Sequence, residues 1–227
     1  MASFLFLLFL GGKEVYLFFF TSSFFKIKEP IININDEGID RRFKEYCYKN
    51  YITTTPNIFK IDIRDLRDYL TKIPDVKEVI IERGLPDIIK INVIKRKPLA
   101  IIPKGTAFLG VDKEGVVFPL DSFQDLPIIT GVNVEEEGKR VKNIGLQRAL
   151  TIISQMKENQ SSILDKISEF NVEDPNDIVS YFTEFPTQIH FREMSKQRLQ
   201  EFKYVLKHID VSKLQYIDLR FQDIVIK

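Results

Sequence analysis

The N-terminal segment constrains this chain more than any other part of its sequence. Residues 2–25 are almost wholly apolar and include eight phenylalanines. A helix needs about 20 apolar residues to cross the hydrocarbon core of a bilayer, and this segment reaches that length. We therefore expect residues 1–25 to form an N-terminal transmembrane helix that anchors the rest of the chain to a membrane.

Two features of this segment leave an alternative open. Lys13 and Glu14 interrupt the apolar run near its centre, where each charge costs about 2.5–3.5 kcal/mol on insertion scales. The small residues at 21–23 also fit the end of a cleaved signal peptide, although no basic residue precedes the apolar stretch. Lys26 and Lys28 follow the segment and argue weakly for the opposite topology, so charge alone does not fix the orientation. We favour a membrane anchor over a cleaved signal peptide for this segment.

The region after the apolar segment has the predicted order strand, helix, helix, strand, strand. Residues 27–34 form a short β-type run, and residues 39–51 place apolar side chains at helical spacing. A second helix, with an aspartate as its cap, is predicted within residues 57–73. Residues 76–83 and 88–95 are β-rich and are joined by turn-forming residues, which predicts a hairpin.

The remainder of the chain is predicted to be richer in strands. Short β-type runs cover residues 99–102, 107–111, 116–118, 126–131, 167–172, 178–182 and 187–191. Helical periodicity marks residues 146–156 and 195–209. Residues 216–227 form a long β-type run whose phase slips near Gln222 and Asp223, where we expect a bulge or bend. The whole pattern predicts an α+β chain whose second domain is dominated by an antiparallel sheet.

The composition argues against several functional classes. The 33 basic and 32 acidic residues leave a net charge of +1, which does not favour nucleic acid as a partner. Cys47 is the sole cysteine, and the two histidines are most simply a water-facing strand residue, His190, and a cation at a helix end, His208. We find no phosphate loop, metal-ligand pattern or catalytic constellation. The sequence therefore predicts a protein that is not an enzyme and has no cofactor, metal or small-molecule substrate.

Several stretches together resemble the FtsQ/DivIB family of cell-division proteins. The collinear matches are FFKIK at residues 24–28, NIFKID at 57–62, IPDVKEVIIERGLPDIIKINVIKRKPLAII at 73–102, GVDKEGVVF at 110–118, LPIITG at 126–131 and YIDLRF at 216–221. The resemblance implies a membrane anchor at residues 1–25, a POTRA-like domain at 26–96 and an FtsQ/DivIB-type β domain at 97–227.

The resemblance also implies what the protein does. A member of this family is a divisome scaffold in the cell inner membrane at the division septum, with most of its chain extracytoplasmic, and it binds FtsB/FtsL-like partners. We expect the run 219–227 to accept a partner strand by β-augmentation. The predicted contact residues are Arg192, Leu219, Arg220, Phe221, Asp223 and Ile224.

Rival interpretations exist for both the function and the residues. A POTRA-containing envelope assembly or polypeptide-transport accessory protein is the alternative function, although residues after 96 hold neither further POTRA repeats nor a C-terminal barrel. The edge of the POTRA-like domain is a second possible docking surface for a membrane-proximal partner. Among the contact residues, Phe221 could instead face the core, and Arg192 could be an ordinary surface charge.

Overall fold

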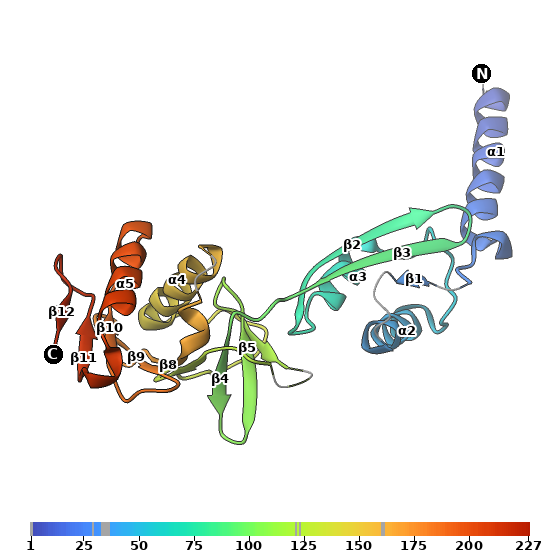
Figure 1. Ribbon diagram of the computed structural model, residues 1–227. Coiled ribbons are helices and arrows are strands. Elements are labelled where there is room, and N and C mark those ends of the chain that lie inside the picture. The colour runs from blue at the N-terminus through green and yellow to red at the C-terminus, as the bar shows by residue number, and fades with distance from the viewer. Residues whose placement is uncertain (1, 29, 33–36, 121, 123, 160–161) are drawn as a thin grey trace. The chain divides into compact units, whose positions relative to one another are not determined.

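The computed structural model divides the chain into two compact units (Figure 1). It describes residues 2–28, 30–32, 37–120, 122, 124–159 and 162–227. The N-terminal unit comprises Met1–Lys95 and the C-terminal unit comprises Arg96–Lys227.

The N-terminal unit begins with helix α1, Ala2–Thr21, which is followed by the short 3-10 turn η1, Ser23–Phe25. Figure 1 shows α1 leaving this unit at the end where the β2–β3 turn lies. The prediction of a helix in the apolar segment is confirmed. Within the described residues, no helix combines the length and hydrophobicity that a membrane span requires.

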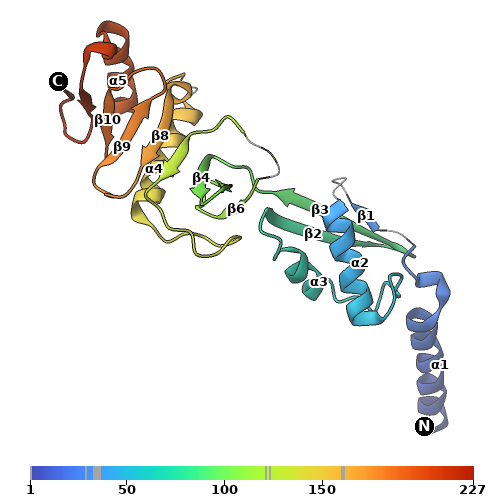
Figure 2. The same cartoon turned by 90° about the horizontal axis from the view of Figure 1, so that it is seen from below.

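A three-stranded sheet and two helices form the rest of the N-terminal unit. The strands are β1, Pro30–Ile32, β2, Val76–Gly84, and β3, Ile88–Lys95, in the spatial order β1-β3-β2. β3 pairs antiparallel with β2 and parallel with β1. The helices are α2, Glu37–Tyr51, and α3, Ile63–Leu70, and both views place them on one face of the sheet (Figures 1 and 2).

The predicted order of elements in this unit is confirmed. β1 is shorter than the predicted run 27–34, of which residues 29, 33 and 34 lie outside the described residues. Alternation along β3 buries every second side chain, because residues of opposite parity face opposite sides of a strand. These side chains meet the apolar stripes of α2 and α3 and close one continuous core.

Local chemistry explains how helix α3 is positioned. The Asp62 carboxylate accepts hydrogen bonds from the backbone N–H groups of Arg64 and Asp65, so it caps the helix as predicted. These bonds lower the pKa of Asp62. Arg83 on β2 donates to the carbonyls of Ile58 and Ile61, which ties the loop before the helix to the sheet.

A long mixed sheet forms the backbone of the C-terminal unit. Its strands are β4, Ala100–Lys104, β5, Ala107–Val111, β6, Val117–Pro119, β7, Ile128–Thr130, β8, Ile167–Asn171, β9, Ile178–Phe182, β10, Gln188–Phe191, β11, Tyr216–Asp218, and β12, Val225–Ile226. Their spatial order is β12-β11-β10-β9-β8-β7-β4-β5-β6, so β12 is an edge strand. The 3-10 turns η2, Leu164–Lys166, and η3, Val211–Lys213, lie in its connections.

Helices α4, Ile144–Glu158, and α5, Lys196–His208, cover one face of this sheet, and Figure 2 shows β8, β9 and β10 from the other side. Their buried stripes pack with the inward residues of the strands in a single core. Asn143 caps α4, and Ser195 caps α5 as predicted. The predicted α+β class is therefore confirmed, but the sheet is mixed, since β7 pairs parallel with β4 and β8, and β10 pairs parallel with β11.

Candidate functional site

The C-terminal edge of the large sheet is the first candidate site. β12 pairs antiparallel with β11, and among the described strands it has no neighbour on its other side. The N–H and C=O of Lys227 both bond to Tyr216. Because paired and outward-directed backbone groups alternate along an antiparallel strand, the N–H and C=O of Ile226 point toward the open edge. This edge therefore presents backbone groups that another strand can pair with.

The predicted single run at residues 216–227 is wrong, while the predicted bend near Gln222 and Asp223 is confirmed. The chain ends β11 at Asp218, turns back, and re-enters the sheet as β12. The Asp218 carboxylate accepts from the backbone N–H of Arg220 at 3.0 Å, a local bond that favours a turn over an extended strand. Only the last few residues of the predicted edge strand thus form the edge.

A partly buried ionic network fixes the start of this turn. The Arg220 guanidinium donates to both carboxylate oxygens of Asp218, at 3.0 and 2.6 Å, and lies 2.9 Å from Asp177. His190 Nδ1 lies 2.8 Å from Asp177, so this histidine does not simply face water as predicted. Its side chain is only 17% exposed. The network therefore links β10, β11 and the loop before β9, and holds the start of the turn against them.

The charged groups in this network also shift each other's pKa. Burial alone would raise the pKa of Asp218, but hydrogen bonds from Arg220 outweigh burial and lower this pKa. The hydrogen bond to Asp218 correspondingly raises the pKa of Arg220. Both groups are therefore held in their charged forms at neutral pH, and the turn keeps its support.

A second arginine holds the far side of the turn. Arg198 on α5 donates to the carbonyl of Phe221 and, at 2.8 Å, to the carbonyl of Gln222. Glu201 lies 3.0 Å from the Arg198 guanidinium and steadies it. With its backbone fixed in this way, Phe221 extends its ring outward, where the side chain is 58% exposed. The Arg220 guanidinium carbon lies 5.4 Å from the centre of this ring.

The predicted contact residues have different environments. Phe221 and Asp223 are exposed, whereas Leu219 is 2% exposed and belongs to the core. Ile224 is partly buried against the same core. Leu219 and Ile224 can therefore contribute to a partner contact mainly through their backbone groups.

A shallow groove brings Arg192 and the turn together. Its volume is about 480 Å³, and it is lined by Arg192, Glu193, Ser195, Arg198, Leu219, Arg220, Phe221 and Gln222. Sequence reasoning singled out Arg192 but missed Arg198, Asp177 and His190. Arg198 follows the predicted cap of α5 by three residues, but nothing in the sequence indicates which carbonyls it reaches.

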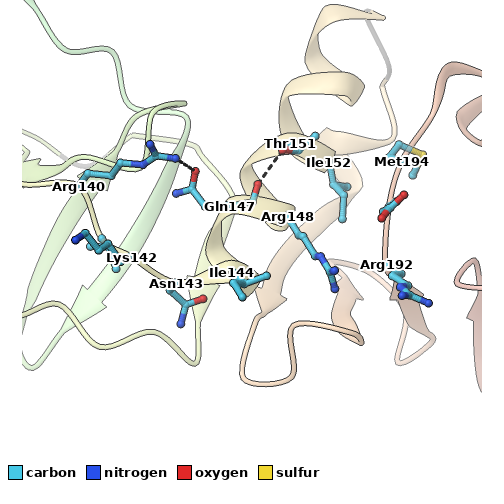
Figure 3. A pocket seen from close by; sticks show the side chains of 12 residues that line it. Arg140, Lys142, Asn143, Ile144, Gln147, Arg148, Thr151, Ile152, Arg192 and Met194 are labelled. Atoms are coloured by element: carbon cyan, nitrogen blue, oxygen red, sulfur yellow. Dashed lines mark hydrogen bonds between the residues drawn. The ribbon is translucent and has the colours of Figure 1, made fainter.

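A second groove of about 660 Å³ lies beside the start of α4 (Figure 3). Basic side chains dominate its polar lining, with Arg140, Lys142, Arg148 and Arg192 against the single acid Glu193. Arg140 donates to Gln147 at 2.7 Å, and Arg148 donates to Asn176 at 3.0 Å. Because Arg192 and Glu193 line both grooves, the basic surface is continuous with the groove at the turn.

Comparison with known proteins identifies the family. The profile described as "Cell division protein FtsQ/DivIB, C-terminal" matches residues 100–220, and the profile "POTRA domain, FtsQ-type" matches residues 50–96. The first match alone covers more than half of the 227 residues. The chain belongs to the FtsQ/DivIB family. The resemblance seen in the sequence is thereby confirmed, and this family is one of cell-division scaffold proteins.

Several proteins named "Cell division protein FtsQ" are similar to this FtsQ/DivIB chain. The protein from Geotalea daltonii is 26% identical over 226 residues, which cover 95% of the chain and 80% of that relative. The protein from Koribacter versatilis is 23% identical, over 75% of the chain and 51% of the relative. The protein from Geobacter sp. strain M21 is 30% identical, over 51% of the chain and 43% of the relative.

Proposed function

We propose that the chain is a divisome scaffold at the division septum, anchored in the cell inner membrane by residues 1–25. Residues 26–96 would act as the POTRA-like domain and residues 97–227 as the partner-binding β domain, both extracytoplasmic. The family assignment supports the role in division. The apolar, phenylalanine-rich character of residues 2–25 supports the anchor.

The partners we propose are FtsB/FtsL-like divisome subunits, bound by strand addition at β12. The open edge at Ile226 is the observation that carries this proposal. A partner strand laid against this edge would exchange backbone hydrogen bonds with Ile226 and with Ile224, which shares its parity. Backbone pairing supplies affinity, and the side chains beside the edge supply specificity.

The neighbouring side chains suggest what the partner strand carries. Phe221 offers an exposed ring, and Arg220 keeps its charge next to that ring. Arg192 is exposed in the groove and can pair with a partner carboxylate. Asp223 lies exposed beside the edge, while Leu219 holds the turn on the core. We therefore expect a partner strand with apolar residues and at least one carboxylate.

A pair of substitutions at one position tests the strand addition. Ile226→Pro removes the outward N–H, whereas Ile226→Ala keeps it and removes only the side chain. A lost backbone pair costs about 1–3 kcal/mol, so we expect Ile226→Pro to weaken capture of an FtsB-like peptide about 5- to 150-fold. Ile224→Pro is expected to act in the same direction. Urea unfolding of each variant provides the control for the fold.

Equal binding by Ile226→Pro and the unaltered chain would reject strand addition. The role in division has its own test, which is a fluorescent fusion of the full chain in dividing cells. We expect enrichment at midcell. A signal spread evenly over the envelope would contradict the proposed role, whatever the peptide binds.

A further inference from the structure

The N-terminal unit exposes three apolar side chains around the base of α1. Phe24 in η1 is 61% exposed, Ile52 in the loop after α2 is 83% exposed, and Leu85 in the β2–β3 turn is 62% exposed. We call these three residues the foot. They come from separate parts of the sequence, so the fold rather than the chain order brings their loops to one end of the unit.

Backbone hydrogen bonds place the two loops beside η1. The N–H of Lys28 donates to the carbonyl of Asp87, and the Lys28 ammonium lies 2.7 Å from the Asp87 carboxylate. This contact holds the β2–β3 turn next to the segment that follows η1. On the other side, the N–H of Ile27 donates to the carbonyl of Pro56 at 3.0 Å, which holds the loop after α2. Figure 2 shows α1 emerging at this end of the sheet.

Helix α1 is locked to the same end. The side-chain amide of Asn57, a residue only 7% exposed, donates to the carbonyl of Phe19 at 2.9 Å and to that of Ser22 at 3.5 Å. The Phe19 carbonyl lies in the last turn of α1, where backbone acceptors lack helical partners, and Ser22 follows directly after the helix. The Asn57 amide oxygen also accepts from the N–H of Phe59 at 2.9 Å. A buried amide thus joins the end of α1 to the folded unit.

Aromatic packing reinforces this junction. The Phe59 ring lies 5.4 Å from the ring of Phe19, 5.9 Å from that of Phe20 and 5.1 Å from that of Phe25. Ring centres at these separations are in favourable contact. The anchor segment and the foot therefore belong to one packed body, and the end of α1 does not hang from a free linker.

We infer that the foot rests in the interfacial layer of the membrane, with Phe24, Ile52 and Leu85 at the boundary between headgroups and acyl chains. The inference depends on the proposed anchoring of residues 1–25. A helix that leaves the bilayer at Thr21 brings its packed neighbours to the bilayer surface. Exposed apolar tips at that position lose their contact with water when they enter the interface.

Two further observations favour lipid as the occupant. Tyrosine and tryptophan side chains are enriched where membrane proteins meet the interface, and α1 exposes Tyr16, at 59%. Lys26 and Lys28 are exposed among these side chains and can contact anionic headgroups. Contact through three separate tips around one helix would hold the N-terminal unit at a fixed tilt to the membrane.

The absence of tryptophan from the sequence permits a direct test. Single tryptophans are introduced by Phe24→Trp, Ile52→Trp or Leu85→Trp into the full chain, which is reconstituted in vesicles of phosphatidylcholine and phosphatidylglycerol. Half of the preparations carry brominated acyl chains, which quench tryptophan on contact. We expect loss of emission on brominated lipid, and a blue-shifted maximum, for all three variants.

The matched control is Ile94→Trp on β3. Ile94 is 44% exposed and lies six residues along the strand from Ile88, which is about 20 Å at the usual rise. We expect the emission of this variant to be the same on brominated and ordinary lipid. Quenching at Ile94→Trp equal to that at Leu85→Trp would mean that the unit lies flat on the lipid, and would overturn the inference.

A probe inside the anchor separates the two proposals. Leu8→Trp lies in the apolar run, and we expect it to be quenched strongly. Quenching at Leu8→Trp with none at the foot would overturn the inference but would still support the membrane anchor. This result is expected if a protein partner or a second copy of the chain covers the foot. No quenching at Leu8→Trp would overturn the anchoring, and with it this inference.

Discussion

Removal of the Arg198 side chain should loosen the C-terminal edge without unfolding the unit. Arg198 is 16% exposed at its side chain and donates to the carbonyls of Phe221 and Gln222. Arg198→Met keeps a side chain of similar length on α5 and removes both donors. The turn between β11 and β12 would then depend on the Arg220 network alone.

The size of the effect follows from the environment of the two carbonyls. A hydrogen bond to a charged group contributes about 1.5–3 kcal/mol when its loss leaves a buried partner unpaired. Phe221 and Gln222 are exposed, so water can replace part of the interaction. We therefore expect a loss of about 1–2 kcal/mol in the free energy that keeps the turn closed. This loss increases the open fraction about 5- to 30-fold.

Amide hydrogen exchange measures this opening directly. The N–H groups of Lys227 and Gln215 donate across the β11–β12 pair, so their exchange reports the opening of the edge. We expect both to exchange about 5- to 30-fold faster in Arg198→Met, with amides of β9 unchanged. Lys207→Met removes an exposed charge from the same helix and should leave these rates unaltered.

Two results would refute this reasoning. Unchanged exchange at Lys227 and Gln215 would show that Arg198 does not hold the turn. Faster exchange throughout the C-terminal unit would show that the substitution destabilises the fold as a whole. Arg198→Lys supplies a further check, because a lysine retains the charge and can reach one carbonyl. The exchange rates of Lys227 and Gln215 in this variant should fall between those in the unaltered chain and those in Arg198→Met.

Three other predictions concern stability and reactivity. Because the pKa of Asp218 is lowered on folding, its carboxylate stabilises the folded chain at pH values above the unfolded pKa of about 3.9, and this stabilisation is lost as pH falls through the folded pKa. In urea unfolding from pH 5 to pH 2, the free energy of unfolding of Asp218→Asn should therefore depend less on pH than that of the unaltered chain. Burial raises the pKa of the Cys47 thiol to about 12, so iodoacetamide at pH 8 should label this thiol far more slowly in buffer than in urea. Equal labelling rates in buffer and in urea would contradict the buried position of Cys47. Asn143→Ala removes the cap of α4 and should lower the free energy of unfolding of the C-terminal unit by about 1 kcal/mol in a denaturant titration, while an unchanged midpoint would show that the cap is dispensable.

Local patterns in the sequence were enough to predict most elements. Apolar spacing and a capping aspartate indicated α3, and alternation along residues 88–95 indicated both β3 and its buried face. The cap and stripe of α5 were equally clear. These predictions hold because capping and amphipathic spacing act over a few residues, so the sequence contains all of the information they need.

The course of the C-terminal segment was not predictable in the same way. Residues 216–227 have the composition of one strand, and the sequence shows only a slip in phase. The reversal into β11 and β12 depends on Arg220 meeting Asp177 and on Arg198 meeting two carbonyls, and these partners are more than twenty residues apart in the chain. Similarly, only the fold shows that Leu219 is buried while Phe221 is exposed.

The sequence by itself determined the family, the elements and the apolar N-terminal segment of this protein, because each of these depends on residue type and local order. The tertiary structure decided which backbone groups remain open at the β12 edge, which side chains surround it, and which apolar tips meet at the base of α1. These features arise from pairing between distant segments, and the register of such pairing is set by packing against the core rather than by any one segment.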